Sequence, residues 1–181
     1  ARSLSYRLRA RRDRFLREFL LRNGRRILDI GGTTLYWRRV GIDFRERNGF
    51  SITLVNIARA ELGEGPFEAL IGNGTALDFP DRAFDVVHSN SVIEHVGSDA
   101  KIADFAREIR RLAPAYYVQT PNRYFPIDPH FYPLPGFQFL PRAAKIAALR
   151  HLPIATAGRI ADPAVAADAV DHTRLLSAGA M

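Results

Sequence analysis

The chain has 181 residues, which suits one domain of ordinary size, and its 47% hydrophobic and 25% charged residues are typical of a folded, soluble protein. It contains no cysteine, so disulfides, thiolate-bound metals and thiol catalysis are excluded. No apolar run approaches the roughly 20 residues that cross a membrane, and no secretory signal is visible. We therefore expect a cytoplasmic location.

The net charge of +7 is concentrated at the N-terminus. Residues 1–26 contain ten arginines and two acidic residues, whereas the rest of the chain holds 16 basic and 17 acidic residues. Apolar residues recur in this segment at helical spacing: Leu4, Leu8, Phe15, Leu16, Phe19 and Leu20. Asn23-Gly24 then indicates a helix end, so we predict a basic amphipathic helix over residues 1–24.

The role of this helix stays open at the level of sequence. One face can simply pack on the domain while the other is solvated. Alternatively, the helix can form a lid over a ligand, or residues 1–22 can contact an anionic membrane surface or a nucleic acid.

Five short apolar runs predict the strands of a sheet. They are residues 26–30, 51–57, 67–71, 84–89 and 115–120. Their lack of polar alternation is typical of parallel strands that are covered on both faces. The crossovers include a clear amphipathic helix at 98–112, whereas 35–48, with Gly41, predicts only a poorly formed helix. We therefore predict an α/β fold with a Rossmann-like parallel sheet flanked by helices.

The segment after the fifth run has a different composition. Residues 121–141 hold six of the eleven prolines and six of the nineteen aromatic residues, which predicts an ordered insert. Residues 142–150 and 163–176 predict two further helices. We expect residues 25–120 to form the core and 121–181 to belong to the same domain.

Small polar residues and glycines follow the predicted strands. Because ligands bind beyond the carboxyl ends of parallel strands, these residues are the first candidates for a site. They are Asp29, Gly31, Gly32, Thr33, Asn56, Asn73, Gly74, Ser89 and Asn90.

These segments resemble those of a known family. Residues 27–32 (Ile-Leu-Asp-Ile-Gly-Gly) are similar to the first motif of class I S-adenosylmethionine-dependent methyltransferases. Residues 72–87 and 89–96 are similar to that family's passage through its fourth strand, most closely in the methyltransferase type 11 subgroup. The resemblance implies S-adenosyl-L-methionine as cofactor and covers about residues 25–120.

The resemblance assigns a role to each residue at the strand ends. Asp29 would lie near the methionine amino group of the cofactor, beside the turn of Gly31 and Gly32, with Thr33 following. Asn56 would face the ribose hydroxyls and Asn73 the adenine amino group. The remaining members of the set would be the Gly74 backbone at the adenine, and Ser89 and Asn90 at the methionine end.

The chain also departs from the family pattern. Thr33 and Leu35 stand where further glycines are usual, and Asn56 and Asn73 stand where acids are usual. A neutral amide accepts a weaker hydrogen bond than a carboxylate does, so we expect weak cofactor binding. The family's last two strands are missing before Met181, and we expect a chain truncated near its C-terminus.

Methyl transfer by in-line displacement needs positioning and a deprotonated acceptor. His95 and His130 are the candidate catalytic bases, and His88 is a weaker one because it lies inside a strand. The candidate substrate-binding residues are Asn122, Arg123, Tyr124 and Tyr132. No recognised ligand spacing accompanies the histidines, so we expect no metal.

Three functions therefore remain at the level of sequence. The first is methyl transfer to a small-molecule or sugar-like acceptor. The second is a degenerate protein that binds an adenosyl ligand weakly without catalysis. The third, methylation of nucleic acid, is disfavoured because Ser89-Asn90-Ser91-Val92 stands where a base-methylating motif of the Asn-Pro-Pro-aromatic type is expected.

Overall fold

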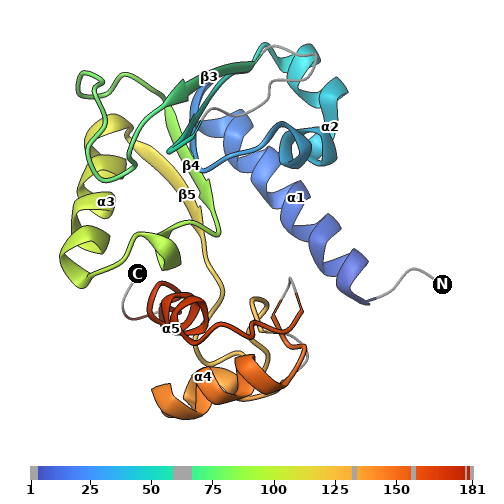
Figure 1. The fold of residues 1–181 in the computed structure, drawn as a ribbon. Coiled ribbons are helices and arrows are strands. Elements are labelled where there is room, and N and C mark those ends of the chain that lie inside the picture. The colour runs from blue at the N-terminus through green and yellow to red at the C-terminus, as the bar shows by residue number, and fades with distance from the viewer. Residues whose placement is uncertain (1–3, 59–66, 132–133, 156–157, 178, 180–181) are drawn as a thin grey trace. The chain divides into compact units, whose positions relative to one another are not determined.

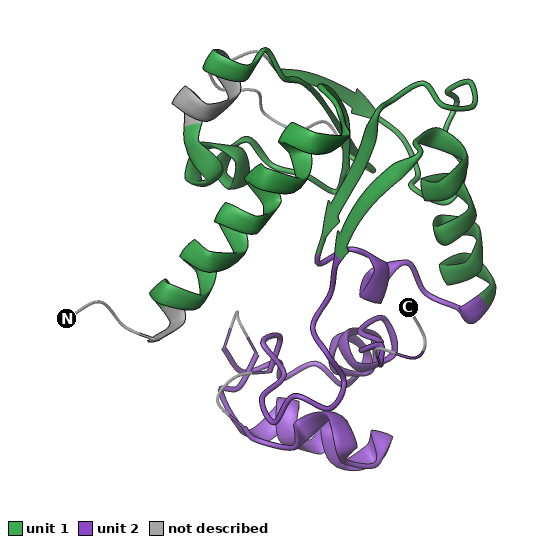
Figure 2. Cartoon of the chain, turned by 180° about the vertical axis from the view of Figure 1, so that it is seen from behind, with its two compact units in different colours: residues 1–90, 100–118 green, residues 91–99, 119–181 purple. Residues whose placement is uncertain are grey.

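A computed structural model describes residues 4–58, 67–131, 134–155, 158–177 and 179, without the side chains of residues 4, 5 and 42–46. The chain divides into two compact units (Figure 2). Unit 1 comprises residues 1–90 and 100–118, and unit 2 comprises residues 91–99 and 119–181. In the described part of the chain, no helix combines the length and apolarity needed to cross a bilayer.

Unit 1 is built on a five-stranded sheet (Figure 1). Its strands are β1 (Arg26–Ile30), β2 (Ser51–Asn56), β3 (Phe67–Ile71), β4 (Val86–Asn90) and β5 (Ala115–Gln119), in the spatial order β3-β2-β1-β4-β5. β1 pairs in parallel with both β2 and β4, and β2 pairs in parallel with β3. The strand order therefore reverses next to β1, which is where ligands bind in open sheets of this kind.

Helices cover both faces of the sheet, with α1 (Leu4–Asn23) and α2 (Thr34–Asn48) opposite α3 (Asp99–Leu112) (Figure 1). Leu16 and Leu20 of α1 and Trp37 of α2 are fully buried against the β1, β2 and β4 side chains. These contacts and the matching strand positions confirm the predicted α/β class and Rossmann-like sheet.

Two helix predictions are borne out in part. The segment expected to form a poor helix at 35–48 is helical from Thr34 onward, but it consists of two helices that meet at a kink at Gly41, with φ 118° and ψ 114°. The predicted apolar stripe of α1 is also wrong in part. Leu8 and Phe15 are more than half exposed, and the buried face instead carries Asp13, Leu16 and Leu20.

Unit 2 has its own small core of Phe131, Phe137, Leu149, Ile154 and Ala166. Its elements are η1 (Ile93–His95), η2 (Phe137–Phe139), α4 (Arg142–His151) and α5 (Pro163–Asp171). The helix predicted to reach residue 176 therefore ends at residue 171. Asp162 caps its start by accepting hydrogen bonds from the backbone N–H groups of Ala164 and Val165.

Candidate functional site

Asp29 lies at the centre of a buried polar cluster at the end of β1. Its Oδ2 accepts a hydrogen bond of 2.6 Å from the Trp37 indole, and its Oδ1 is 2.7 Å from His88 Nδ1. His88 Nε2 in turn contacts the Tyr36 hydroxyl at 3.2 Å. Because both carboxylate oxygens are engaged inside the protein, Asp29 acts as a structural anchor of the β1 turn in this arrangement.

Sequence reasoning missed the partners of Asp29. The signal for His88 was nevertheless present, because Asp29 and His88 are register neighbours on β1 and β4. An acid and a histidine in two apolar strands that become adjacent are natural partners. Burial raises the pKa of the Tyr36 hydroxyl strongly, which keeps that hydroxyl protonated.

The glycine turn follows Asp29 directly. Gly31 has φ 75°, the left-handed region that favours glycine. A Cβ on Gly32 would overlap the Asp29 carboxylate, so this position also requires glycine. Thr33, which replaces an expected glycine, caps α2 because its Oγ1 accepts a hydrogen bond from the Tyr36 backbone N–H at 3.3 Å.

The ends of β2 and β4 contribute three further predicted residues. The Asn56 amide donates to the Gly32 carbonyl at 3.0 Å, and no described residue donates to its Oδ1. The Ser89 hydroxyl donates to the Ile30 carbonyl at 3.0 Å. Asn90 Oδ1 is buried and has no partner among the described residues. Asn56 and Asn90 therefore each have an acceptor oxygen with no donor among the described residues.

The loop after β3 carries Asn73 and Gly74. Asn73 Oδ1 accepts hydrogen bonds from both the backbone N–H and the hydroxyl of Thr75, at 3.1 and 2.9 Å. A Cβ on Gly74 would meet Ile30 and Phe105 at under 3 Å, so this glycine lets the loop pack on the sheet and α3. The carbonyl oxygen of Asn73 is thus already occupied.

Helix α3 fixes the same loop from the other side. Glu108 Oε2 accepts from the Leu77 backbone N–H at 2.9 Å, and Arg111 donates to the carbonyls of Leu77 and Phe79. Arg111 also pairs with Glu108 at 2.8 Å. The Arg111 guanidinium lowers the pKa of the Glu108 carboxyl, so the pair stays charged at neutral pH.

The two candidate catalytic histidines lie together in unit 2. Their Nε2 atoms are 3.2 Å apart. His95 Nδ1 contacts the His172 backbone carbonyl at 3.2 Å, and His130 Nδ1 contacts the Asp128 carboxylate at 2.8 Å. A carbonyl and a carboxylate accept hydrogen bonds, so each Nδ1 carries a hydrogen, and in an uncharged ring the lone pair then lies on Nε2.

The predicted substrate-binding residues are only partly brought together. Arg123 lines a cavity of about 490 Å³ in unit 2, together with Lys145 and Gln138. The Asn122 side chain instead accepts from the Tyr124 backbone N–H, and the Tyr124 ring is exposed. Tyr132 lies outside the described residues. Gln138, which the sequence did not single out, has a buried Oε1 with no partner in the described part of the chain.

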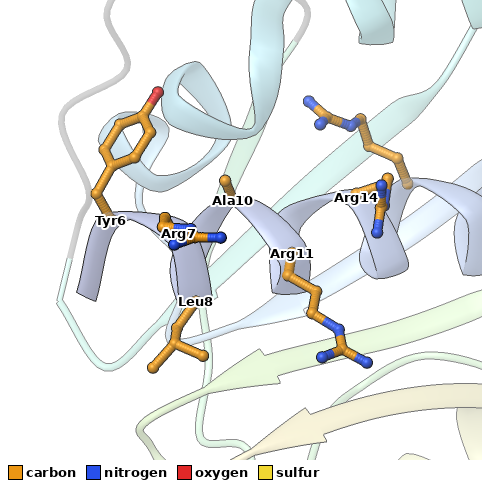
Figure 3. Close-up of a pocket in the computed structure, with 7 residues that line it drawn as sticks. Tyr6, Arg7, Leu8, Ala10, Arg11 and Arg14 are labelled. Atoms are coloured by element: carbon orange, nitrogen blue, oxygen red, sulfur yellow. The ribbon is translucent and has the colours of Figure 1, made fainter. Parts of the chain in front are cut away.

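A basic hollow runs along α1 (Figure 3). Among the described residues, all of its lining belongs to that helix: Tyr6, Arg7, Leu8, Ala10, Arg11, Arg14 and Arg17. Figure 3 shows apolar and guanidinium side chains spread along the same helix. The hollow is therefore a mixed apolar and cationic surface of one helix.

Comparison with known proteins supplies the identity of the fold. The family profile described as "Methyltransferase domain" matches residues 28–114, the segment that carries the glycine turn, the Asn73 loop and α3. Residues 28–114 are thus similar to a methyltransferase domain. Together with the strand order, this match confirms the resemblance to class I S-adenosylmethionine-dependent methyltransferases.

One solved structure supports this fold, and two others show a weaker similarity. A protein described as a methyltransferase from an antibiotic biosynthesis pathway of Anabaena variabilis superposes with a TM-score of 0.53 at 20% identity, covering 78% of this chain and 60% of that one. A protein from Pyrococcus horikoshii gives a TM-score of 0.47 at 22% identity, covering 64% and 59% of the two chains. A methyltransferase from Methanosarcina mazei gives 0.44 at 18% identity, covering 57% and 55%.

The coverage sets the limits of the comparison. The chain spans between 55% and 60% of the length of these three structures. No curated protein matches the chain.

The methyltransferase domain indicates S-adenosylmethionine as its cofactor. The residues at the strand ends fit this group in part. The buried Asn90 Oδ1 lacks a partner among the described residues, and Asn56 keeps a carbonyl oxygen for a ribose hydroxyl. Asp29 and Asn73, in contrast, have their oxygens engaged within the protein.

Proposed function

We propose that the chain catalyses S-adenosylmethionine-dependent methyl transfer to a small-molecule or sugar-like acceptor by in-line displacement. The main support is that Asn56 and Asn90 have acceptor oxygens without described donors at the carboxyl ends of β2 and β4, beside the Gly31 turn. When bound, the cofactor supplies an electrophilic methyl group. Asn56 would hold the ribose and Asn90 the methionine end, so that the methyl group is presented in a fixed direction.

The cavity in unit 2 supports an anionic acceptor. Arg123 and Lys145 line it, and neither side chain has a carboxylate within ion-pair distance among the described residues. Burial lowers the pKa of the Lys145 amine, while the nearby Asp128 carboxylate opposes this shift. The unpartnered Gln138 Oε1 would accept a hydrogen bond from an acceptor hydroxyl or amine. An acceptor with both an acidic group and a hydroxyl fits these residues.

His95 and His130 are the proposed groups that deprotonate the acceptor. Each presents the Nε2 lone pair, because its Nδ1 is held by a backbone carbonyl or by Asp128. An imidazole nitrogen with a free lone pair can accept a proton from an oxygen or nitrogen acceptor.

A second candidate is a protein that binds an adenosyl ligand weakly without catalysis. It is favoured by the engagement of Asp29 with Trp37 and His88, because each carboxylate oxygen already accepts one hydrogen bond and the side chain is buried, which disfavours a contact with the methionine amino group. The Thr75 contacts of Asn73 support the same conclusion at the adenine.

Calorimetry with S-adenosylmethionine and its demethylated product tests the adenosyl site. We expect both ligands to bind, and Asn90→Ala to weaken binding, whereas Asn23→Ala at the end of α1 should leave it unchanged. No heat with either ligand would contradict both candidates. Transfer of a labelled methyl group into small anionic metabolites would then separate the enzyme from the non-catalytic binder.

The exposed side chains of helix α1 support the proposal that this helix binds an anionic membrane surface. Tyr6, Leu8 and Phe15 are substantially exposed between arginines, a pattern that suits lipid headgroups and acyl chains together. Leu8→Ser with Phe15→Ser should reduce binding to phosphatidylserine vesicles and keep the fold. Deleting residues 1–22 is a poor test because it removes Leu16 and Leu20 from the core. Binding to nucleic acid but not to vesicles would favour the third function.

A further inference from the structure

We propose that Glu94, His95 and His130 bind one divalent transition-metal ion, through Glu94 Oε1 and the two histidine Nε2 atoms. These three ligand atoms all lie within 4.8 Å of one another, and all belong to unit 2. The site uses none of the residues proposed to bind the adenosyl group, and it departs from the expectation that the chain binds no metal.

The two imidazole rings present their lone pairs to each other. Both Nδ1 atoms carry hydrogen, because one faces the His172 carbonyl and the other the Asp128 carboxylate. Two neutral Nε2 acceptors at 3.2 Å repel unless something positive lies between them. Two nitrogens at about 2.1 Å from a tetrahedral zinc ion are about 3.4 Å apart, so the observed spacing suits a shared metal.

Glu94 supplies the third ligand and the charge. Its side chain is fully buried, and its Oε2 accepts a hydrogen bond of 2.8 Å from the Thr120 hydroxyl. Its Oε1 has no partner among the described residues and lies 4.0 Å from His130 Nε2. Burying a carboxylate oxygen without a hydrogen-bond donor destabilises the fold, and a cation at this position would offset that loss of free energy.

Every proposed ligand is oriented on its far side. Asp128 holds His130 and also accepts from the His130 backbone N–H, the His172 carbonyl holds His95, and Thr120 holds Glu94. This second layer of hydrogen bonds is the pattern that fixes the tautomer and direction of metal-binding side chains. Three neighbouring groups therefore orient the three ligand atoms toward one point through hydrogen bonds.

The donor set selects the kind of metal. Two imidazole nitrogens and one carboxylate oxygen favour zinc and neighbouring transition metals over magnesium and calcium, which prefer oxygen ligands. Three protein ligands also leave an open position, as in catalytic zinc sites. With the ion bound, both Nε2 lone pairs are engaged, so neither histidine acts as the base. The ion would instead lower the pKa of an acceptor hydroxyl at the open position. This role rests on the proposed function, but metal binding itself does not.

Calorimetric titration of the chelator-treated full chain with Zn²⁺ tests the proposal. We expect one ion per chain, and His95→Ala, His130→Ala and Glu94→Gln should each weaken binding by about tenfold or more. Mg²⁺ should show no comparable binding. His151→Ala, at an exposed histidine on α4, is the matched control and should bind as the unmodified chain does.

Melting curves show which variants stay folded, and Asp128→Asn offers a milder change that keeps all three ligands. A flat Zn²⁺ titration, or binding that all the ligand variants retain, overturns the proposal. If the two Nε2 atoms share a proton instead of a metal ion, the Zn²⁺ titration will be flat. The Zn²⁺ titration contains neither cofactor nor acceptor. Its result therefore tests the metal site independently of whether the chain transfers methyl groups.

Discussion

Gly32 is the residue whose replacement the structure forbids most clearly. A Cβ there would overlap the Asp29 carboxylate, and that carboxylate cannot move because Trp37 and His88 hold both of its oxygens. We expect Gly32→Ala to lower the free energy of unfolding by about 2 kcal/mol or more, as overpacking of a well-ordered site does. Urea denaturation measures the change. Gly179→Ala, with open space around it, is the control, and equal effects of the two changes would contradict the prediction.

Replacing Asn73 by aspartate should strengthen the binding of the cofactor. Asn73→Asp keeps the Oδ1 contacts to Thr75 and adds a second, charged oxygen that can accept from the adenine amino group. We expect the affinity for S-adenosylmethionine to rise by up to about tenfold in calorimetry, because charge-assisted hydrogen bonds are about twice as strong as neutral ones. Unchanged affinity would mean that adenine does not reach this residue.

Helix α2 depends on its first hydrogen bond. Thr33 Oγ1 accepts from the Tyr36 N–H, and Tyr36 and Trp37 then carry the helix onto His88 and Asp29. Thr33→Ala should cost about 1 kcal/mol of unfolding free energy, whereas Thr33→Ser keeps the cap and should cost little. Thermal or urea denaturation of the pair measures the cap. Equal loss in both variants would assign the effect to the threonine methyl group instead.

Helix α3 gives a pH-dependent prediction. The Glu108 carboxyl has a lowered pKa because Arg111 and the Leu77 N–H stabilise its charged form, and Asp85 has a lowered pKa because the Arg25 and Arg26 N–H groups do the same. Such carboxyls stabilise the fold above their ordinary pKa of about 4, and this contribution is lost as pH falls through the lowered value. We expect stability to drop below about pH 5.

The matched variant for this effect is Glu108→Gln. It keeps a side-chain oxygen for the Leu77 N–H but removes the charge that faces Arg111. Its stability should be lower at neutral pH and should fall less steeply on acidification, in urea denaturation across a pH series. An identical pH profile would show that the pair does not stabilise the native state.

Among the described residues, each of the two units has a hydrophobic core of its own. Phe137 is buried among Phe131 and the α4 and α5 side chains of unit 2, and Trp37 is buried in unit 1. Phe137→Ala should therefore speed amide hydrogen exchange in α4 and α5 while leaving β1 and β2 protected. A uniform loss of protection would mean that the chain unfolds as one cooperative unit. The predicted domain boundaries at 24 and 120 await this measurement.

Much of the fold could be predicted because it rests on local patterns. Apolar runs marked the strands of unit 1, and the amphipathic spacing marked α3. The errors arose where tertiary contacts outweighed the local pattern. On α1, packing against β1 and β2 buries Leu16 and Leu20 and leaves Leu8 exposed. At α2, the Thr33 cap and the buried Trp37 form a helix that the composition disfavours.

The sequence by itself determined the class of sheet, the strand-end residues and the position of the basic helix. Strands buried on both faces appear in the sequence as apolar runs, and helices appear as apolar residues at helical spacing. Only the tertiary structure decided which polar groups are free. Asp29 lost both oxygens to Trp37 and His88, whereas Asn90 and Glu94 each kept a buried oxygen without a described partner. A hydrogen bond between residues distant in the chain requires geometry, which residue order does not contain.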